Sequence, residues 1–311
     1  MKNILVLGAS GMLGSMMVDF LSRAASLTVT ASVREPNLLR RFQTLYPNIR
    51  WEQFRFDGEN TSFDLLDGQD WVLNAIGITK PLVRDDDAGQ IETAIRVNSL
   101  LPHCLGRAAK VRGARVLQIA TDCVYSGAKG GYRETDIHDA LDVYGKTKSL
   151  GESYQENVQH LRCSIIGPEP KDFKFLVEWF RGQPEGAQVN GFTNHYWNGL
   201  TTLQFARICM GVVENDLALP HLQHVVPADS MAKADMLREF AIAYNRQDMC
   251  INDVEAHYSI DRTLATNNAE LNETLWRAAG YQRPPSVAEM IHEMAHYQYA
   301  AAATAVKEEL S

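Results

Sequence analysis

The 311-residue chain has 38 acidic and 30 basic side chains, a net charge of −8 with neutral histidines, and 45% hydrophobic residues. This acidic balance argues against nucleic-acid binding, and the ordinary hydrophobic fraction indicates a globular protein. Because no run of about 18 apolar residues occurs and the five cysteines are widely spaced, we expect no membrane span, no disulfide framework and a cytoplasmic location.

An apolar run at residues 3–7 predicts a buried parallel strand. The string Gly8-Ala-Ser10-Gly11-Met12-Leu13-Gly14 follows, and residues at helical spacing come next. Glycines between a strand and a helix let the backbone turn tightly and approach a pyrophosphate, which binds at the helix N-terminus. The sequence therefore predicts a dinucleotide site here.

A second strand is predicted at residues 27–33 and is followed by Arg34. A Rossmann site for NAD usually has an acidic residue at this place, whereas an arginine can pair with a 2′-phosphate. The pattern favours NADP(H), with NAD(H) still possible. The alternative is that Arg34 is a solvated loop residue.

Strand and helix patterns continue to alternate up to residue 166, which predicts an α/β fold with a doubly wound parallel Rossmann sheet. The further predicted strands are 49–56, 71–77, 115–120 and 161–166, and the helices are 91–112 and 144–159. Asn98 lies on the apolar face of the first of these helices, where an amide is more often structural than catalytic.

The alternation breaks after Pro168, which indicates a smaller, mostly helical C-terminal substrate-binding domain. We expect helices at 172–181, 201–214, 230–245, 266–279 and 286–305, short strands at 188–190 and 224–227, and a polar, aromatic loop at 191–199. The predicted division is a Rossmann domain at 1–167, with a probable return near 200–227, and a cap made of 168–199 and 228–311.

Three side chains form a candidate catalytic group. Thr121 follows the strand at 115–120, and Tyr144 and Lys148 are four residues apart, so they share one face of a helix. A neighbouring ammonium is expected to lower the pKa of the Tyr144 phenol and make it a usable acid or base. The Thr121 hydroxyl could bond the same substrate oxygen.

The order of these motifs resembles the extended short-chain dehydrogenase/reductases. The segments around Thr121-Asp122, the acidic loop Tyr132-x-Glu134-x-Asp136 and Tyr144-Gly-x-x-Lys148-x-x-Gly-Glu152 look most like the dTDP-4-dehydrorhamnose reductase branch. The resemblance is specific over residues 1–167. Where that branch has Arg-x-Ser-Trp, this chain has Arg162-Cys-Ser164-Ile165, so a substrate-packing aromatic residue is missing.

The resemblance also implies roles for single residues. The implied cofactor-binding residues are Gly8, Ser10, Gly11, Met12, Leu13, Gly14, Arg34, Asp57, Asn74, Ala75, Ile76, Gly77, Asn98, Tyr144, Lys148 and Cys163. The candidate substrate-binding residues are Thr79, Asp122, Cys123, Asn194, Trp197, Asn198 and Arg262. The alternative for Arg262 is a salt bridge at a helix start.

The function implied is NADPH-dependent reduction of a 4-keto-(6-deoxy) nucleotide sugar, in activated-sugar or surface polysaccharide biosynthesis. Two alternatives stay open. The first is a nucleotide-sugar epimerase or dehydratase that retains its cofactor, and the second is a non-catalytic regulatory subunit that binds NADP.

Two further expectations concern assembly and metals. The helices at 91–112 and 144–160 have apolar residues on more than one side, and relatives of this kind often pair such helices, so we expect a homodimer. The string His292-Glu-Met-Ala-His296 matches a zinc-protease pattern, but no third ligand follows, and we expect a surface helix without metal.

Overall fold

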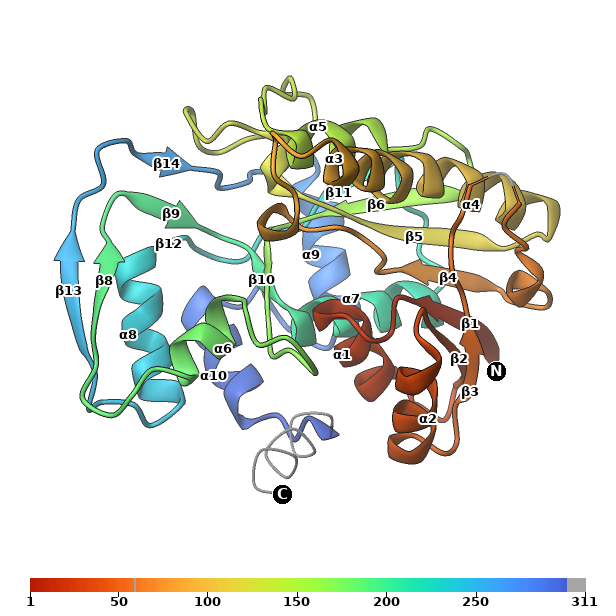
Figure 1. Ribbon diagram of the computed structural model, residues 1–311, viewed down its shortest axis with the longest axis horizontal. Helices are drawn as coiled ribbons and strands as arrows, with labels where there is room; N and C mark the ends of the chain where they lie inside the picture. The colour runs from red at the N-terminus through yellow and green to blue at the C-terminus, as the bar shows by residue number, and fades with distance from the viewer. Residues whose placement is uncertain (59, 301–311) are drawn as a thin grey trace.

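The computed structural model describes residues 1–58 and 60–300. In this part of the chain a seven-stranded sheet has the order β11-β6-β5-β4-β1-β2-β3 (Figure 1), and every neighbouring pair is parallel. Its strands are β1 (Lys2–Leu7), β2 (Leu27–Val33), β3 (Arg50–Gln53), β4 (Trp71–Asn74), β5 (Arg115–Ala120), β6 (Val158–Arg162) and β11 (Leu222–His224). The winding reverses between β1 and β4, so the predicted doubly wound Rossmann fold is confirmed.

Helices cover both faces of the sheet because the side chains of a strand alternate in direction. In β1, Ile4 and Val6 belong to one buried cluster, and Leu5 and Leu7 belong to the other. The first cluster lies under α1 (Met12–Leu21), α2 (Pro36–Leu45) and α7 (Thr202–Glu214), and the second lies under α4 (Leu101–Val111). Figure 1 shows α3 (Ala88–Ala94) and α5 (Val143–Leu150) on the same side as α4.

The helix predicted at 91–112 consists of α3, a π-helical segment at Ile95–Leu100, and α4. Pro102 is the second residue of the second α-helix and has no N–H, so it cannot donate to the carbonyl of Asn98. Gly151 packs against that carbonyl so closely that a Cβ there would lie 1.9 Å from the oxygen. The change of helix type therefore occurs where a proline and a close backbone approach coincide.

The helix expected at 144–159 ends at Leu150, and β6 begins at Val158, three residues earlier than predicted. The contact with Gly151 explains the early end. The helix expected at 172–181 is also shorter, since α6 is Leu176–Arg181. Asp172 and Phe173 have φ angles of 68° and 47°, which a right-handed helix excludes.

Beyond the sheet lies a smaller group of helices and short strands (Figure 1). It contains α6, α8 (Lys233–Ala243), α10 (Val287–His296), the parallel pair β8 (Gln188–Phe192) and β13 (Cys250–Val254), and a three-stranded sheet of β12 (Met231–Ala232), β9 (His195–Trp197) and β14 (Ile260–Asp261). The expected loop at 191–199 is thus partly strand. The helix expected at 286–305 ends at His296, and residues 301–305 lie outside the described residues.

Residues after the predicted domain boundary return to the large sheet. Helix α7 packs against α1, and β11 extends the large sheet beside β6, while β10 (Leu200–Thr201) pairs with β7 (Ile165–Ile166) in a separate two-stranded sheet. The remaining helix, α9 (Ala269–Ala278), also packs against α7. The division into domains at residue 167 stays a prediction.

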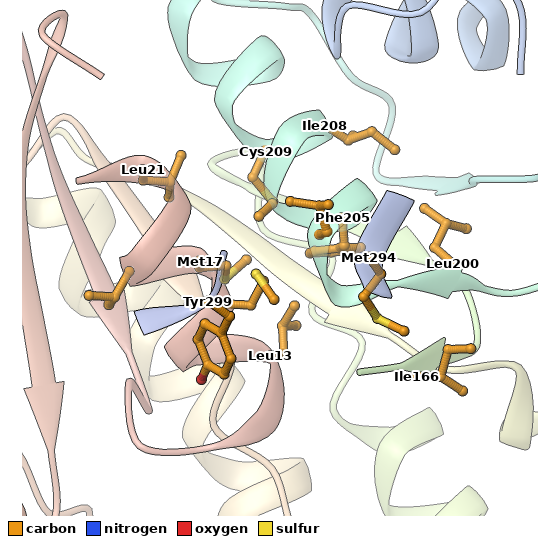
Figure 2. Close-up of a cluster of buried hydrophobic side chains, with 14 of the residues drawn as sticks. Leu13, Met17, Leu21, Ile166, Leu200, Phe205, Ile208, Cys209, Met294 and Tyr299 are labelled. Carbon is orange, nitrogen blue, oxygen red and sulfur yellow. The ribbon is translucent and has the colours of Figure 1, made fainter. Parts of the chain in front are cut away.

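A buried cluster joins α1 to the C-terminal segment. Figure 2 shows Leu13 and Met17 of α1 facing Phe205 of α7, with Met294 of α10 and Tyr299 beside them. The Tyr299 hydroxyl donates to the Ser15 Oγ at 2.6 Å, and the Tyr297 hydroxyl donates to the buried Asp19 carboxylate at 2.7 Å. These contacts fix α1, whose N-terminus follows the glycine turn. Among the described residues, no helix combines the length and apolarity that crossing a bilayer requires.

Candidate active site

The glycine turn after β1 has the shape that a pyrophosphate site needs. Gly8 has a φ of +79°, and a Cβ on Gly14 would lie 2.2 Å from the Gly8 carbonyl oxygen. Gly11 caps α1 without a side-chain hydrogen bond, and no acidic residue lies in the first turn. A Cβ on Gly11 would meet nothing closer than 3.5 Å. The first backbone N–H groups of α1 therefore lie at the positive end of the helix dipole and have enough open space beside them to bind an anion.

The predicted cofactor residues around this turn contribute mainly backbone. A Cβ on Gly8 would lie 3.2 Å from the Ala75 carbonyl carbon and 3.1 Å from the Ile76 nitrogen. The backbone segments that follow β1 and β4 are therefore too close for a larger residue at position 8. Leu13 points into the core (Figure 2), Ser10 is buried, and Met12 is half-buried. Gly77 is held near Asn98, since a Cβ on it would lie 3.6 Å from the Asn98 Oδ1.

Two predicted cofactor residues use their amides inside the protein. The buried Asn74 side chain donates to the Gln118 Oε1 at 2.6 Å and accepts from the Ile76 backbone. The Asn98 side chain accepts from the Ile78 backbone N–H at 2.8 Å and donates to its carbonyl at 2.9 Å. These amides shape the loop after β4, and any direct contact of theirs with a cofactor stays a prediction.

The remaining predicted cofactor residues lie at different depths. Arg34 is exposed at the end of β2, and its Nε donates to the Glu35 carboxylate at 2.7 Å. The exposed Asp57 accepts from the Thr61 hydroxyl at 2.7 Å. Cys163 is buried in the core after β6, and burial raises its pKa. Sequence reasoning did not consider the acidic partner of Arg34.

The candidate catalytic side chains gather at the carboxyl end of β5. Thr121 follows that strand, and its hydroxyl lies near the Tyr144 phenol, whose pKa it lowers. Asp142 caps α5 by accepting from the Gly145 backbone at 2.7 Å, which starts the helix one turn before Lys148. The Lys148 Nζ donates to the Ile119 carbonyl at 3.2 Å. The i, i+4 spacing therefore brings both α5 residues to the strand end, as expected.

The electrostatics of Tyr144 correct one expectation. Burial raises the pKa of the Tyr144 phenol above its ordinary value, the neighbouring Cys123 and Asp122 raise it further, and the neighbouring Thr121 hydroxyl lowers it. The direction is opposite to the predicted effect of Lys148. The reason is loss of water together with nearby acidic groups. Tyr144 is consequently a neutral phenol at pH 7, which is the form that donates a proton.

Two charged side chains shift the pKa of Lys148 in opposite directions. Burial lowers its pKa to about 8, the Glu152 carboxylate raises it, and the Arg162 guanidinium lowers it. Arg162 is fully buried and bonded to Glu152. The sequence offered a signal for both residues, because Glu152 follows Lys148 by four positions in the motif and Arg162 begins the string Arg162-Cys-Ser164-Ile165, but it did not show that the two side chains pair.

The predicted substrate residues next to Thr121 are largely withdrawn from water. Burial raises the pKa of the Asp122 carboxyl, and Arg262 and Lys233 lower it. Burial likewise raises the pKa of the Cys123 thiol to about 12. The Thr79 Oγ1 is buried and has no hydrogen-bond partner among the described residues.

The predicted substrate residues of the cap differ in whether their side chains are already bonded to the cap's own backbone. The Asn194 amide bonds both backbone groups of Ala256, and the Asn198 amide bonds both backbone groups of Leu264. These two side chains fold their own chain, so a substrate contact for them is not favoured by the geometry. In contrast, the Trp197 indole donates to the Ser164 Oγ at 2.8 Å, beside the end of β6.

Arg262 lies close to the catalytic side chains. Its Nε donates to the Tyr125 carbonyl at 2.9 Å, and it lines a cavity of about 370 Å³ together with Asp85, Tyr125, Ser126, Ala140, Leu141 and Asp142. Lys233, which sequence reasoning missed, is near Asp122, Cys123 and Arg262. The helix-start salt bridge proposed as an alternative for Arg262 is not formed with any described residue.

The zinc-protease string makes other contacts. His292 bonds the Glu239 carboxylate at 2.9 Å, and Glu293 pairs with Arg207 and accepts from the Tyr281 hydroxyl. The His296 Nδ1 is bonded to the His292 carbonyl. Within residues 1–58 and 60–300, no group of three or more potential metal ligands occurs.

The helix with the Tyr-x-x-x-Lys spacing follows the fifth strand of a Rossmann sheet, and the smaller group of helices and short strands lies beyond that sheet. This is the architecture of the extended short-chain dehydrogenase/reductases, as the sequence predicted. The chain matches the RmlD substrate binding domain family over residues 1–299 and belongs to that family.

Two curated proteins are similar in sequence. The chain is 24% identical to the dTDP-4-dehydrorhamnose reductase of Aggregatibacter actinomycetemcomitans over 223 residues, covering 71% of this chain and 63% of that protein. It is 27% identical to the methionine adenosyltransferase 2 subunit beta of Danio rerio over 174 residues, covering 52% of this chain and 53% of that protein. The match thus spans less than two thirds of either relative.

Two solved structures have the same fold. The dTDP-4-dehydrorhamnose reductase of Bacillus anthracis, in complex with NADP, has a TM-score of 0.67 at 16% identity, covering 94% of this chain and 99% of that one. The UDP-glucuronic acid 4-epimerase of Bacillus cereus, in complex with UDP-glucuronic acid and NAD, has a TM-score of 0.71 at 17% identity, covering 97% and 100%. At these identities the likeness concerns the fold alone.

Proposed function

We propose that the protein is an NADP(H)-dependent reductase of a 4-keto nucleotide sugar. The observation that carries the proposal is the gathering of Thr121, Tyr144 and Lys148 at the carboxyl edge of a Rossmann sheet, with Tyr144 and Lys148 one turn apart on α5. The glycine turn supports a dinucleotide at the neighbouring switch point. Membership of a family whose relatives include nucleotide-sugar reductases supports the substrate class.

In this mechanism the Tyr144 phenol donates its proton to the ketone oxygen as that oxygen becomes an alkoxide. Thr121 donates a hydrogen bond to the same oxygen and holds it in place. NADPH supplies the hydride that is added to the ketone carbon. Lys148 would hold the ribose hydroxyls next to the nicotinamide, and the amides at the start of α1 would hold the pyrophosphate.

The proposed reaction can be tested with a panel of 4-keto nucleotide sugars differing in base and in the substituent at C6. Each compound is mixed with NADPH or NADH, and loss of reduced cofactor is followed at 340 nm. We expect stoichiometric consumption of NADPH with at least one compound. If none of the panel consumes either cofactor, the reductase proposal is wrong.

The alternatives differ in what the same assay shows. An epimerase or dehydratase with retained cofactor would convert the sugar without net loss of NADPH. A regulatory subunit, a possibility favoured by the similarity to methionine adenosyltransferase 2 subunit beta, would bind NADP(H) and convert nothing. Chromatography of the nucleotide sugars from the same mixtures separates these cases.

Cofactor choice gives the next prediction. Arg34 is exposed at the end of β2, where a 2′-phosphate would lie. We expect Arg34→Asp to weaken NADPH binding roughly tenfold or more and to leave NADH binding almost unchanged, because an anion replaces a cation. Binding is measured by fluorescence titration of both reduced cofactors.

The neighbouring carboxylate provides a matched control. Glu35→Gln frees the Arg34 guanidinium from its partner and should leave NADPH affinity equal or tighter. Equal preference for NADH in the wild type and in Arg34→Asp would exclude Arg34 as the specificity residue.

The proposed homodimer rests on exposed apolar side chains. Ile95 and Leu100 of the π-helical segment are 47% and 42% exposed, and Leu150 at the end of α5 is 65% exposed. These two elements pack against each other, so their apolar side chains can form one surface. We expect sedimentation to show a dimer at micromolar concentration and Leu150→Lys to shift it towards monomer. A wild-type monomer under these conditions contradicts the proposal.

A further inference from the structure

Lys233 is a cation close to the catalytic side chains that the mechanism above does not use. It is the first residue of α8 and is half-buried. Burial lowers the pKa of its ammonium to about 8, while Asp122 and Cys123 raise it and Arg262 lowers it. Asp122 and Cys123 directly follow Thr121 in sequence. Lys233 of α8 therefore lies close to the end of β5, where the catalytic side chains gather.

The strands of the cap account for this placement. Strand β12 pairs with β9, so that Met231 lies opposite Trp197, and Lys233 comes two residues later. On the other side, β14 pairs in parallel with β9, which places Arg262 one residue beyond the pair of Asp261 and Tyr196. The small sheet thus places one cation on each side of Trp197, Lys233 after β12 and Arg262 after β14.

Trp197 anchors this sheet to the Rossmann edge. Ala120 of β5 pairs with Arg162 of β6, so Asp122 and Ser164, each two residues further on, come level at the carboxyl edge. The Trp197 indole is bonded to the Ser164 hydroxyl, and the Lys233 Nζ lies 5.6 Å from the centre of the Trp197 ring. The position of Lys233 is consequently fixed relative to the end of β5.

Among the described residues, the Lys233 ammonium has no oxygen atom as a hydrogen-bond partner. Its only hydrogen bond to a described residue is to the Met236 thioether at 3.9 Å, and it forms no ion pair with a described carboxylate. An ammonium has three donors, and a thioether is a weak acceptor. Arg262, by contrast, donates to a carbonyl and is near Asp139 and Asp142. A cation partly withdrawn from water and without oxygen acceptors is suited to receive an anionic group of a ligand.

We propose that Lys233 is a substrate-binding and specificity-determining residue that receives an anionic oxygen of the nucleotide sugar. This assignment rests on the proposed function, because it takes the cleft beside Tyr144 to be the sugar site. The anionic oxygen belongs either to the diphosphate or to a carboxylate on the sugar, and both are recognised by an ammonium in the same way.

The test is a binding experiment on the full-length protein with NADPH present. Calorimetry measures the affinities of UDP, dTDP, UDP-glucose, dTDP-glucose and UDP-glucuronic acid for the wild type, Lys233→Met and Lys233→Arg. Loss of a charge-assisted contact should weaken binding by about ten- to a hundredfold in Lys233→Met, and Lys233→Arg should restore most of it. NADPH affinity and melting temperature should be unchanged.

A matched control lies on the same helix. Arg238 pairs with Asp235 and Asp253 at the surface, so Arg238→Met should leave every nucleotide affinity unchanged. In Lys233→Met, weaker binding of all five ligands identifies the diphosphate as the partner. Weaker binding of UDP-glucuronic acid alone identifies a sugar carboxylate.

The two proposals can fail separately. If the wild type binds nucleotide sugars and Lys233→Met binds them equally well, the role of Lys233 is overturned and the proposed function stands. If the wild type binds none of the five ligands, both are overturned.

Discussion

Replacing Tyr144 with Phe is expected to lower turnover of the nucleotide sugar by about a hundredfold or more, because the substitution removes the proton donor. The aromatic ring remains, so packing around α5 changes little. The lost group is the phenol that lies next to the Thr121 hydroxyl. Steady-state oxidation of NADPH at 340 nm measures the effect, and NADPH affinity should stay within about twofold of the wild type.

Tyr154 provides the control for this substitution. It lies shortly after α5 and is 85% exposed, so Tyr154→Phe should keep full turnover. A Tyr144→Phe enzyme with near-native turnover would remove Tyr144 from the mechanism. Because burial raises the pKa of Tyr144, the phenol is protonated throughout the neutral range, and we expect no loss of turnover from its ionisation between pH 6 and 8.

The parts of the site that depend on local spacing could be predicted from the sequence. Tyr144 and Lys148 share a helical face because they are four residues apart, and Thr121 ends a strand because an apolar run precedes it. The glycine turn could likewise be predicted from neighbouring residues alone, because the glycines stand between a strand pattern and a helix pattern. The roles of these residues stay predictions, but their gathering at one strand end needed no knowledge of distant contacts.

Features that depend on contacts between distant segments escaped prediction. Lys233 reaches the cleft through the pairing of β12 with β9, which no local pattern reveals. The amides of Asn194 and Asn198 suggested ligand contacts, yet they bond the backbones of Ala256 and Leu264. A polar residue in a sequence does not disclose whether its partner is a ligand or its own chain.

The end of α5 shows the same limit in the backbone. Helical spacing continues past Leu150, but Gly151 meets the Asn98 carbonyl, and the chain turns away to begin β6 at Val158. This contact joins residues about fifty positions apart and requires a glycine. It also places Glu152 beneath the catalytic helix, where it reaches Arg162.

Replacing Arg162 with Met is expected to lower the free energy of unfolding by about 3–5 kcal/mol, because it leaves a buried carboxylate without its counter-charge. Arg162 is fully buried and bonds Glu152, the Tyr125 hydroxyl at 2.5 Å and the His138 Nε2 at 2.9 Å. Burial alone would raise the pKa of Glu152, but the charge and hydrogen bond of Arg162 hold it below its usual value. Urea unfolding followed by circular dichroism measures the loss.

Two variants isolate the reason for this loss. In the double variant Arg162→Met/Glu152→Gln the unpaired charge is gone, so part of the stability should return. Arg277, 53% exposed and paired with the 56% exposed Glu273 on α9, is a surface control whose change to Met should cost at most about 1 kcal/mol. An Arg162→Met protein as stable as the wild type would show that the buried pair does not support the fold. Since Glu152 raises and Arg162 lowers the pKa of Lys148, removing only Arg162 should also shift the pKa of Lys148 upwards.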